Sequence, residues 1–168
     1  MKAPLHVLVA EDEIGDVLLL ERAFAKAGVS APVYVAADGQ EVLDYLEGVP
    51  PFNNPVQYPL PDLLLLDLHL PRVNGFEVLT RIRNHPKLSQ MLVVILSSSN
   101  HPEEIQRAGA LGANSYIVKP QDPTELVEVV RGLQEHWQRI NASDGFMPGH
   151  ESEVVQHLTF GRAADLAA

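Results

Sequence analysis

The sequence predicts an α/β fold in which five parallel β-strands alternate with five helices. Short apolar runs alternate along the chain with longer segments of helical periodicity. Two of these runs, residues 62–68 and 92–96, are apolar on both faces, which indicates strands covered by helices on both sides of a parallel sheet. With 168 residues and no cysteine, the chain is long enough to bury such a core without disulfides.

The first half of the chain supplies three strands and two helices. Residues 6–10 (HVLVA) form an apolar run that predicts the first strand. Residues 15–28 carry apolar side chains at helical spacing, and Gly28 is expected to end this helix. A second strand, a short helix and a third strand are then expected at residues 33–36, 40–46 and 62–68.

The second half completes the alternation. Helices are expected at residues 74–84 and 102–111, and strands at residues 92–96 and 115–118. Asp122 is expected to cap the last helix, with Pro123 at its first position. Units of this kind commonly form a doubly wound, flavodoxin-like sheet with right-handed crossovers and the strand order 2-1-3-4-5.

Two segments interrupt the alternation. Residues 48–61 (GVPPFNNPVQYPLP) contain five of the thirteen prolines and predict a long surface loop, which is either a tolerated insertion or a partner contact. Residues 141–168 begin with the breaker-rich run NASDGFMPG, and both a disordered tail and a docking or dimer-contact segment remain open. We therefore expect one domain at residues 1–140 and a tail at residues 141–168.

The charge and the apolar runs exclude several classes of partner. A formal net charge of −10, with scattered lysines and arginines, argues against binding to nucleic acid or to anionic membranes. The sequence shows no signal peptide and no apolar run of bilayer-spanning length, so we expect a cytoplasmic protein. The seven histidines lack zinc-binding spacing, and neither GxxxxGK[ST] nor GxGxxG occurs.

Acidic, hydroxyl and ammonium groups stand at the ends of four predicted strands: Glu11 and Asp12, then Asp67, Ser97 and Lys119. The carboxyl ends of parallel strands share one edge of a sheet, so we expect these groups in one crevice. Two carboxylates about 4 Å apart repel by about 4 kcal/mol at an effective dielectric constant of about 20, so either their pKa values rise or a cation joins them. Oxygen ligands of this kind favour Mg²⁺.

A cation, an ammonium and a hydroxyl are together what a phosphoryl group needs, and a carboxylate can carry that group as an acyl phosphate. Each residue alone has a simpler explanation: Asp67 and Ser97 as turn residues, and Glu11-Asp12 as acids near a helix N-terminus. Their conjunction at four strand ends is what favours phosphoryl chemistry.

The segments VLVAEDE, LLLLDLHLPRVNGFEVL, VVILSSS and GANSYIVKP resemble the receiver domains of two-component response regulators over about residues 5–138. The 30-residue step from Asp67 to Ser97 and the 22-residue step from Ser97 to Lys119 match the spacing in that family. Within the family, the sequence looks closest to the stand-alone regulators that partner cyanobacterial and bacterial phytochrome histidine kinases.

The resemblance implies a role for each group at the strand ends. Asp67 would receive a phosphoryl group from a kinase phosphohistidine, with Ser97 donating its hydroxyl to that group and Lys119 pairing with one of its oxygens. Mg²⁺ would be held by Asp12, by Asp67 and by the main-chain carbonyl of His69, while Glu11 would act through water.

The resemblance also implies a switch. Tyr116 matches the aromatic that turns inward when Ser97 moves, although a half-buried strand tyrosine is the simpler explanation. The face made of the fourth helix, fifth strand and fifth helix would then bind a partner or a second copy. Two departures bear on this: His69 borders the route of attacking water, which affects the lifetime of the acyl phosphate, and Gln121 replaces an aromatic on the output face.

Three functions follow from these observations. The first is a phosphoacceptor module that promotes only its own phosphorylation and dephosphorylation and is otherwise no enzyme. The second is a Mg²⁺ phosphohydrolase, against which His69 counts because such enzymes commonly need an acid at that position. The third is an interaction module that has lost phosphorylation, although all five key groups are present. A flavin-binding protein would share the fold, but no phosphate-cradling loop follows the first strand.

Overall fold

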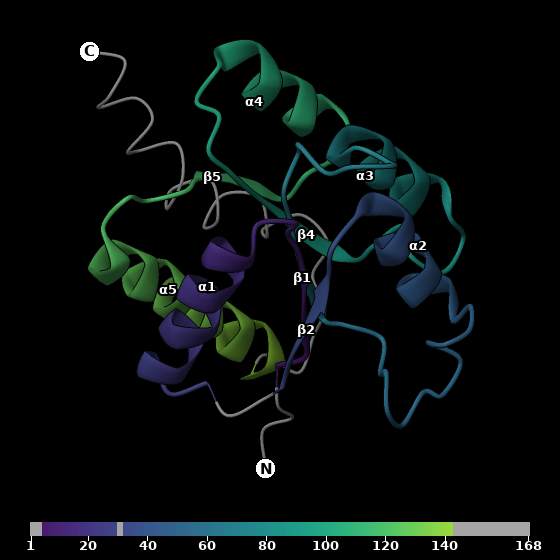
Figure 1. Cartoon of the computed structure of the whole chain (residues 1–168), viewed down its shortest axis with the longest axis horizontal. Coiled ribbons are helices and arrows are strands. Elements are labelled where there is room, and N and C mark those ends of the chain that lie inside the picture. Colours follow the sequence, from purple (N-terminus) through teal and green to yellow (C-terminus); the bar gives the residue numbers. More distant parts are fainter. Residues whose placement is uncertain (1–4, 30–31, 143–168) are drawn as a thin grey trace.

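The computed structural model describes residues 5–29 and 32–142, and it confirms the predicted α/β fold. One parallel sheet has the order β2-β1-β3-β4-β5 (Figure 1). The strands are β1 (Val7–Ala10), β2 (Val33–Ala36), β3 (Leu63–Leu66), β4 (Leu92–Ser97) and β5 (Ser115–Val118). The helices are α1 (Ile14–Lys26), α2 (Gly39–Glu47), α3 (Gly75–Asn84), α4 (Pro102–Ala110) and α5 (Pro123–Ala142).

Helices cover both faces of this sheet. Helices α1 and α5 lie side by side on one face, and α2, α3 and α4 cover the other (Figure 1). Each face has its own core, because successive strand residues point to opposite sides. In β3, Leu63 and Leu65 pack in the core beneath α1 and α5, while Leu64 and Leu66 pack in the core beneath the other three helices. This two-sided burial explains why the sequence of β3 is apolar at every position.

The register of the sheet brings the ends of its strands to one edge. Ala10 pairs with Leu66 across β1 and β3, so the next residues, Glu11 and Asp67, leave the sheet side by side. The backbone N–H of Asp67 donates to the carbonyl of Ala10 at 3.1 Å. At the other strand pair, the backbone N–H of Lys119 donates to the carbonyl of Ser97 at 2.8 Å. Backbone hydrogen bonds therefore hold the ends of β1 and β3, and those of β4 and β5, next to each other.

Helices α2, α3 and α5 begin at side-chain caps, whereas α1 and α4 begin without one. Asp38 accepts a hydrogen bond from the backbone N–H of Glu41 at the start of α2. Asp122 accepts one from the backbone N–H of Thr124 at 2.8 Å, which confirms the predicted cap of α5. Most predicted element ends are correct to within one or two residues. Strand β3 is shorter than residues 62–68, because the chain turns out of the ladder at Asp67 and enters the loop before α3.

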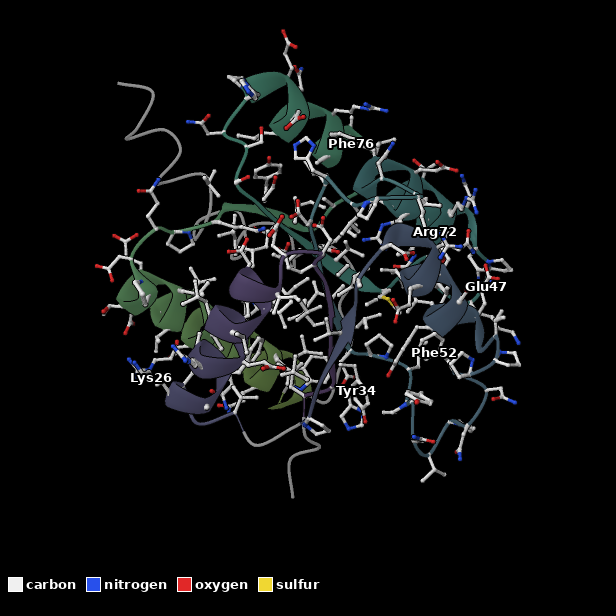
Figure 2. The ribbon with its side chains drawn as sticks, in the orientation of Figure 1. Lys26, Tyr34, Glu47, Phe52, Arg72 and Phe76 are labelled. Carbon is white, nitrogen blue, oxygen red and sulfur yellow. The ribbon has the colours of Figure 1, made fainter. Side chains whose placement is uncertain are left out.

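The proline-rich loop is anchored at its base by an aromatic cluster of Tyr34, Tyr45, Phe52 and Tyr58. The ring centroids in contact lie 5.1 to 6.4 Å apart, and Tyr34 and Phe52 are seen beside the loop in Figure 2. The Tyr45 hydroxyl donates to the carbonyl of Pro59 at 2.9 Å. At the tip, by contrast, Val56 is 90% exposed. The loop thus has a packed base and a solvated tip.

Only the first two residues of the predicted tail lie in the described part of the chain. Helix α5 runs to Ala142, two residues into the range 141–168, and residues 143–168 lie outside the described part of the chain. Among the described helices, none has both the length and the apolar content needed to cross a membrane.

Candidate functional site

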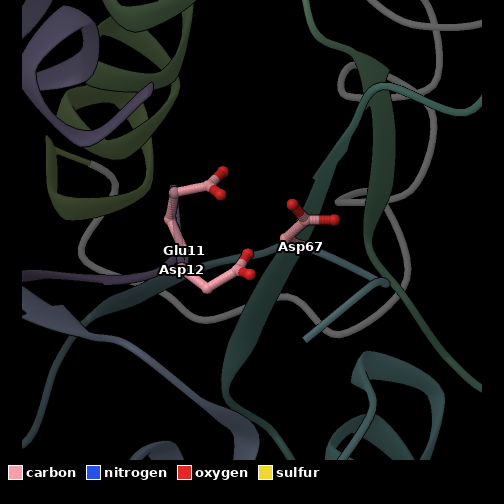
Figure 3. Close-up of side chains that lie close together, drawn as sticks. All are labelled: Glu11, Asp12 and Asp67. Carbon is pink, nitrogen blue, oxygen red and sulfur yellow. The ribbon is translucent and has the colours of Figure 1, made fainter. Parts of the chain in front are cut away.

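Three carboxylates meet where β1 and β3 end. Oxygen atoms of Glu11, Asp12 and Asp67 all lie within 4.8 Å of one another (Figure 3). Glu11 and Asp67 are buried, whereas Asp12 is exposed to solvent. The structure thus brings together the acidic residues that the sequence placed at these two strand ends.

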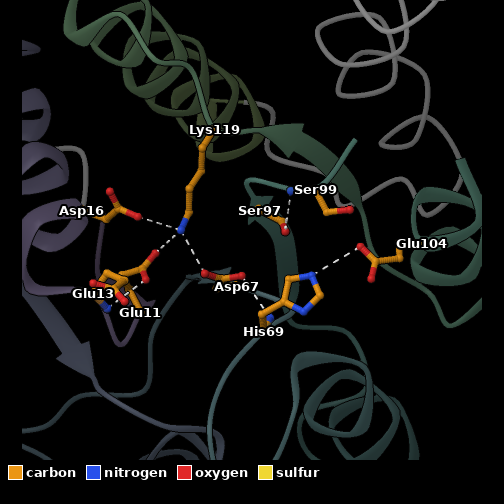
Figure 4. A network of polar contacts seen from close by, with 9 residues as sticks. All are labelled: Glu11, Glu13, Asp16, Asp67, His69, Ser97, Ser99, Glu104 and Lys119. Carbon is orange, nitrogen blue, oxygen red and sulfur yellow. Dashed lines mark hydrogen bonds and ion pairs between the residues drawn. The ribbon is translucent and has the colours of Figure 1, made fainter. Parts of the chain in front are cut away.

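The Lys119 ammonium faces this cluster from the end of β5. Its Nζ atom donates to Asp67 Oδ2 at 2.9 Å and also donates to Glu11 Oε2. A third hydrogen bond, 3.0 Å long, reaches Asp16 Oδ2 in the first turn of α1 (Figure 4). The Lys119 side chain is only 15% exposed, so its three donors are all used by carboxylates.

Burial and these hydrogen bonds shift the pKa values of the paired groups. Burial raises the pKa of Glu11, although hydrogen bonds from Lys119 and from the backbone N–H of Glu13 oppose that shift. Burial alone would lower the pKa of Lys119, but its hydrogen bonds to Glu11 and Asp67 outweigh burial and raise the pKa. The ammonium therefore stays charged at neutral pH and offsets part of the negative charge around it.

Ser97 is the last residue of β4, and Tyr116 lies in the neighbouring strand β5, in register with Ile95. Ser97 is fully buried, and its hydroxyl oxygen accepts a hydrogen bond from the backbone N–H of Ser99 at 3.3 Å. The Tyr116 side chain points inward with 4% exposure, and its hydroxyl donates to the carbonyl of Ser99 at 2.7 Å. Burial raises the pKa of Tyr116. The tyrosine is thus more deeply buried than the simpler sequence interpretation, a half-buried strand residue, would have it.

His69 lies between the buried aspartate and α4. Its backbone N–H donates to Asp67 Oδ1 at 3.1 Å. Its ring Nε2 lies 3.4 Å from Glu104 Oε2 on α4, and the side chain is 57% exposed (Figure 4). The imidazole ring of His69, which the sequence places beside the route of attacking water, therefore extends toward Glu104 on α4.

The start of α3 lies against the backbone of Asp67 and Leu68. The first residue of α3, Gly75, donates its backbone N–H to the carbonyl of Leu68 at 2.9 Å. A Cβ atom at Gly75 would lie 2.4 Å from the carbonyl oxygen of Asp67 and 2.7 Å from the Cα of Leu68. Only glycine lets α3 start this close to the end of β3.

The donor set of this site fits a hard divalent cation. Glu11, Asp12 and Asp67 offer only oxygen atoms, and the exposure of Asp12 leaves room for water ligands. The structure therefore assembles the acidic residues and the lysine that the sequence singled out, with Ser97 at the end of β4 and Tyr116 in the neighbouring strand β5.

Two contributors were missed from the sequence. Asp16 escaped notice because an acid in the first turn of a helix is favoured by the helix dipole in any case. Glu104 belongs to a predicted helix, and no local pattern in the sequence indicates that its side chain meets His69. The spacing EDxxxD from Glu11 to Asp16 was the only available signal.

Comparison with known proteins gives a consistent result. Residues 7–131 match the family described as the response regulator receiver domain. A probable methanogenesis regulatory protein, FilR2 of Methanothrix harundinacea, is 34% identical over 84% of this chain and 89% of its own length. The crystal structure of response regulator RPA3017, in red light signaling of R. palustris, has 37% identity and a TM-score of 0.75, covering 79% of this chain and 93% of that one. The phosphorylated cyanobacterial phytochrome response regulator RcpA has 33% identity and a TM-score of 0.74, covering 88% and 100%.

Proposed function

The chain belongs to the response regulator receiver family, and we propose that it is a stand-alone regulator that accepts a phosphoryl group on Asp67 from a sensor histidine kinase. The observation that carries this proposal is the position of the Asp67 carboxylate. Its Oδ2 atom accepts a hydrogen bond from the Lys119 ammonium, it groups with the carboxylates of Glu11 and Asp12 within 4.8 Å, and its side chain is 8% exposed. An ammonium and a place for a cation, both next to one carboxylate, are what an incoming phosphoryl group requires.

The transfer exchanges one bond to phosphorus for another. A carboxylate oxygen of Asp67 attacks the phosphorus of a kinase phosphohistidine, the P–N bond breaks, and the imidazole leaves with the electron pair and takes up a proton. Lys119 pairs with a phosphoryl oxygen, and Ser97 donates its hydroxyl to another. Mg²⁺, which we propose is held by Asp12, Asp67 and the main-chain carbonyl of His69, with Glu11 acting through water, supplies positive charge to the phosphoryl oxygens.

The output of the proposed switch is a protein contact. Phosphorylation adds a charge of about −1.5 to −2 and three acceptor oxygens beside Ser97. We propose that Ser97 is drawn toward these oxygens, and that the inward position of Tyr116 is thereby favoured. The face formed by α4, β5 and α5 would then bind a partner protein or form a homodimer.

The proposed kinase is of the phytochrome class. The two solved structures reported above are response regulators of red light or phytochrome signalling, by their own descriptions. FilR2, by contrast, is described as a probable methanogenesis regulatory protein and not as a regulator of light signalling. The test compares the rate of phosphotransfer from a phytochrome kinase with the rate from an unrelated sensor kinase over the same short times. Equal rates would contradict the assignment to the phytochrome class.

We propose that the chain lies in the cytoplasm. We also propose that it does not turn over phosphorylated substrates other than its own acyl phosphate. No acid stands two residues after Asp67, where His69 is found, so no second carboxylate is in place there to activate water as in carboxylate-nucleophile phosphohydrolases.

Incubation with Mg²⁺ and acetyl phosphate, followed by intact-mass spectrometry, tests the central proposal. We expect a Mg²⁺-dependent gain of one phosphoryl group by the natural chain and no gain by Asp67→Asn. Because rapid hydrolysis can hide the adduct, binding of beryllofluoride, a mimic of the phosphoryl group, is measured in parallel. If the natural chain gains no mass and does not bind the mimic, the phosphoacceptor function is wrong and a pure interaction module takes its place.

A further inference from the structure

We infer that Asp16 is a positioning residue, which holds the Lys119 ammonium at the site when the other two partners of that ammonium turn to the cation and the phosphoryl group. This inference rests on the proposed function. It concerns a carboxylate that lies outside the acidic cluster of Glu11, Asp12 and Asp67, although it shares the same lysine.

The three partners of Lys119 differ in what else they must do. Glu11 and Asp67 belong to the cluster whose oxygens lie within 4.8 Å of one another, so a divalent cation draws on both of them. Asp67 also gives up one carboxylate oxygen to the new bond when it carries a phosphoryl group. Asp16 neither belongs to the cation-binding cluster nor carries the phosphoryl group, because its side chain comes from the first turn of α1 and not from a strand end.

The exposure of the three carboxylates supports this division. The Glu11 and Asp67 side chains are 2% and 8% exposed, whereas that of Asp16 is 41% exposed. Asp16 thus stays hydrated on its outer side while its Oδ2 atom holds Lys119 Nζ at 3.0 Å. A hydrated carboxylate can keep this bond at little desolvation cost, whichever groups occupy the buried side.

The charges around Lys119 explain why such an anchor is needed. A bound divalent cation repels the ammonium and competes with it for Glu11 and Asp67. If those two were its only partners, Lys119 would be free to swing out to water as the cation binds. With Asp16 in place, the ammonium moves a short way toward α1 and stays beside Asp67, ready to meet the phosphoryl oxygens.

The test follows the lysine ammonium groups by NMR in the full chain, labelled with isotope in its lysines. The sequence holds only four lysines, and Lys119→Arg identifies the signal of interest. Ammonium protons are observed when hydrogen bonds protect them from exchange with water. We expect the Lys119 signal of the natural chain to persist after saturation with Mg²⁺, and that of Asp16→Asn to be present without Mg²⁺ and lost with it.

Glu13→Gln is the matched control. Glu13 is an exposed acid three residues from Asp16, and its carboxylate makes no contact with Lys119 among the described residues. Both variants remove one negative charge near the cation and are expected to weaken Mg²⁺ binding by a few-fold, so affinity alone does not separate them. Only Asp16→Asn should lose the ammonium signal.

Three results would overturn the inference: persistence of the Lys119 signal in Mg²⁺-loaded Asp16→Asn, loss of that signal in the Mg²⁺-loaded natural chain, or a spectrum of the natural chain in which no signal shifts when Mg²⁺ is added. None of these measurements needs phosphate. A natural chain that behaves as expected here and yet gains no phosphoryl group from acetyl phosphate would refute the proposed function and leave the role of Asp16 standing.

Discussion

Replacing Gly75 with alanine tests whether the close approach of α3 positions the phosphorylation site. The new Cβ would lie 2.4 Å from the carbonyl oxygen of Asp67, whereas ordinary contacts begin at 3.4 Å, so the backbone must move by about 1 Å. Overpacking of this kind costs about 1–3 kcal/mol. The better helix propensity of alanine returns at most about 1 kcal/mol, and weakening of the hydrogen bond from Gly75 to Leu68 removes about as much again.

The expected result is therefore a loss of about 1–3 kcal/mol in the free energy of unfolding, measured by urea titration. Because a misplacement of about 1 Å at a reacting group can cost about a hundredfold in rate, phosphorylation by acetyl phosphate should slow to a similar degree. Gly109→Ala is the control. Nothing lies within 4 Å of its Cβ position in α4, so it should stabilise the chain by up to about 1 kcal/mol and leave the rate unchanged. If Gly75→Ala matches the natural chain in both assays, the contact has no positioning role.

Three further predictions concern the residues around the sheet. Arg83→Lys should lower the free energy of unfolding by about 2–3 kcal/mol in urea titrations, because the guanidinium makes four hydrogen bonds that a lysine cannot reproduce; a cost under about 0.5 kcal/mol would contradict this. Burial raises the pKa of Tyr45 in the folded chain. Above a pH of about 10 the tyrosine therefore ionises in the unfolded chain first, and the stability that the neutral side chain contributes below that pH is lost as the pH rises. Tyr45→Phe should therefore show a shallower fall in stability between pH of about 9 and about 11, and an unchanged slope would refute the shift. Tyr116→Ala should abolish the phosphorylation-dependent association seen by gel filtration while Asp67 is still phosphorylated, whereas association equal to that of the natural chain would remove Tyr116 from the switch.

The sequence was sufficient to place the residues whose position depends on topology alone. Asp67 and Lys119 follow strands of one parallel sheet, so their meeting at one edge follows from the alternation of strands and helices. Asp16 could not be placed in this way. Its approach to Lys119 depends on how far α1 is rotated over the sheet, which is set by packing between α1 and α5.

Side-chain direction was the second limit of the sequence. The inward position of Tyr116 depends on the space beside Ser97 and on an acceptor at the carbonyl of Ser99, neither of which has a local signature. The proline-rich loop is a similar case. Its prolines predicted a loop correctly, but the contacts of Phe52 and Tyr58 with Tyr45 connect segments whose aromatic residues follow no periodicity.

The packed base and solvated tip of residues 48–61 make this loop a natural handle for engineering. The aromatic cluster packs the base of the loop, and Asn54 organises the tip by accepting hydrogen bonds from the backbone N–H groups of Val56 and Gln57. A dye or an epitope attached at Val56, which is 90% exposed, would thus lie in solvent at the loop tip and outside the acidic cluster. Because the tip is separate from the acidic cluster, substitutions there should leave the chemistry at the strand ends unchanged.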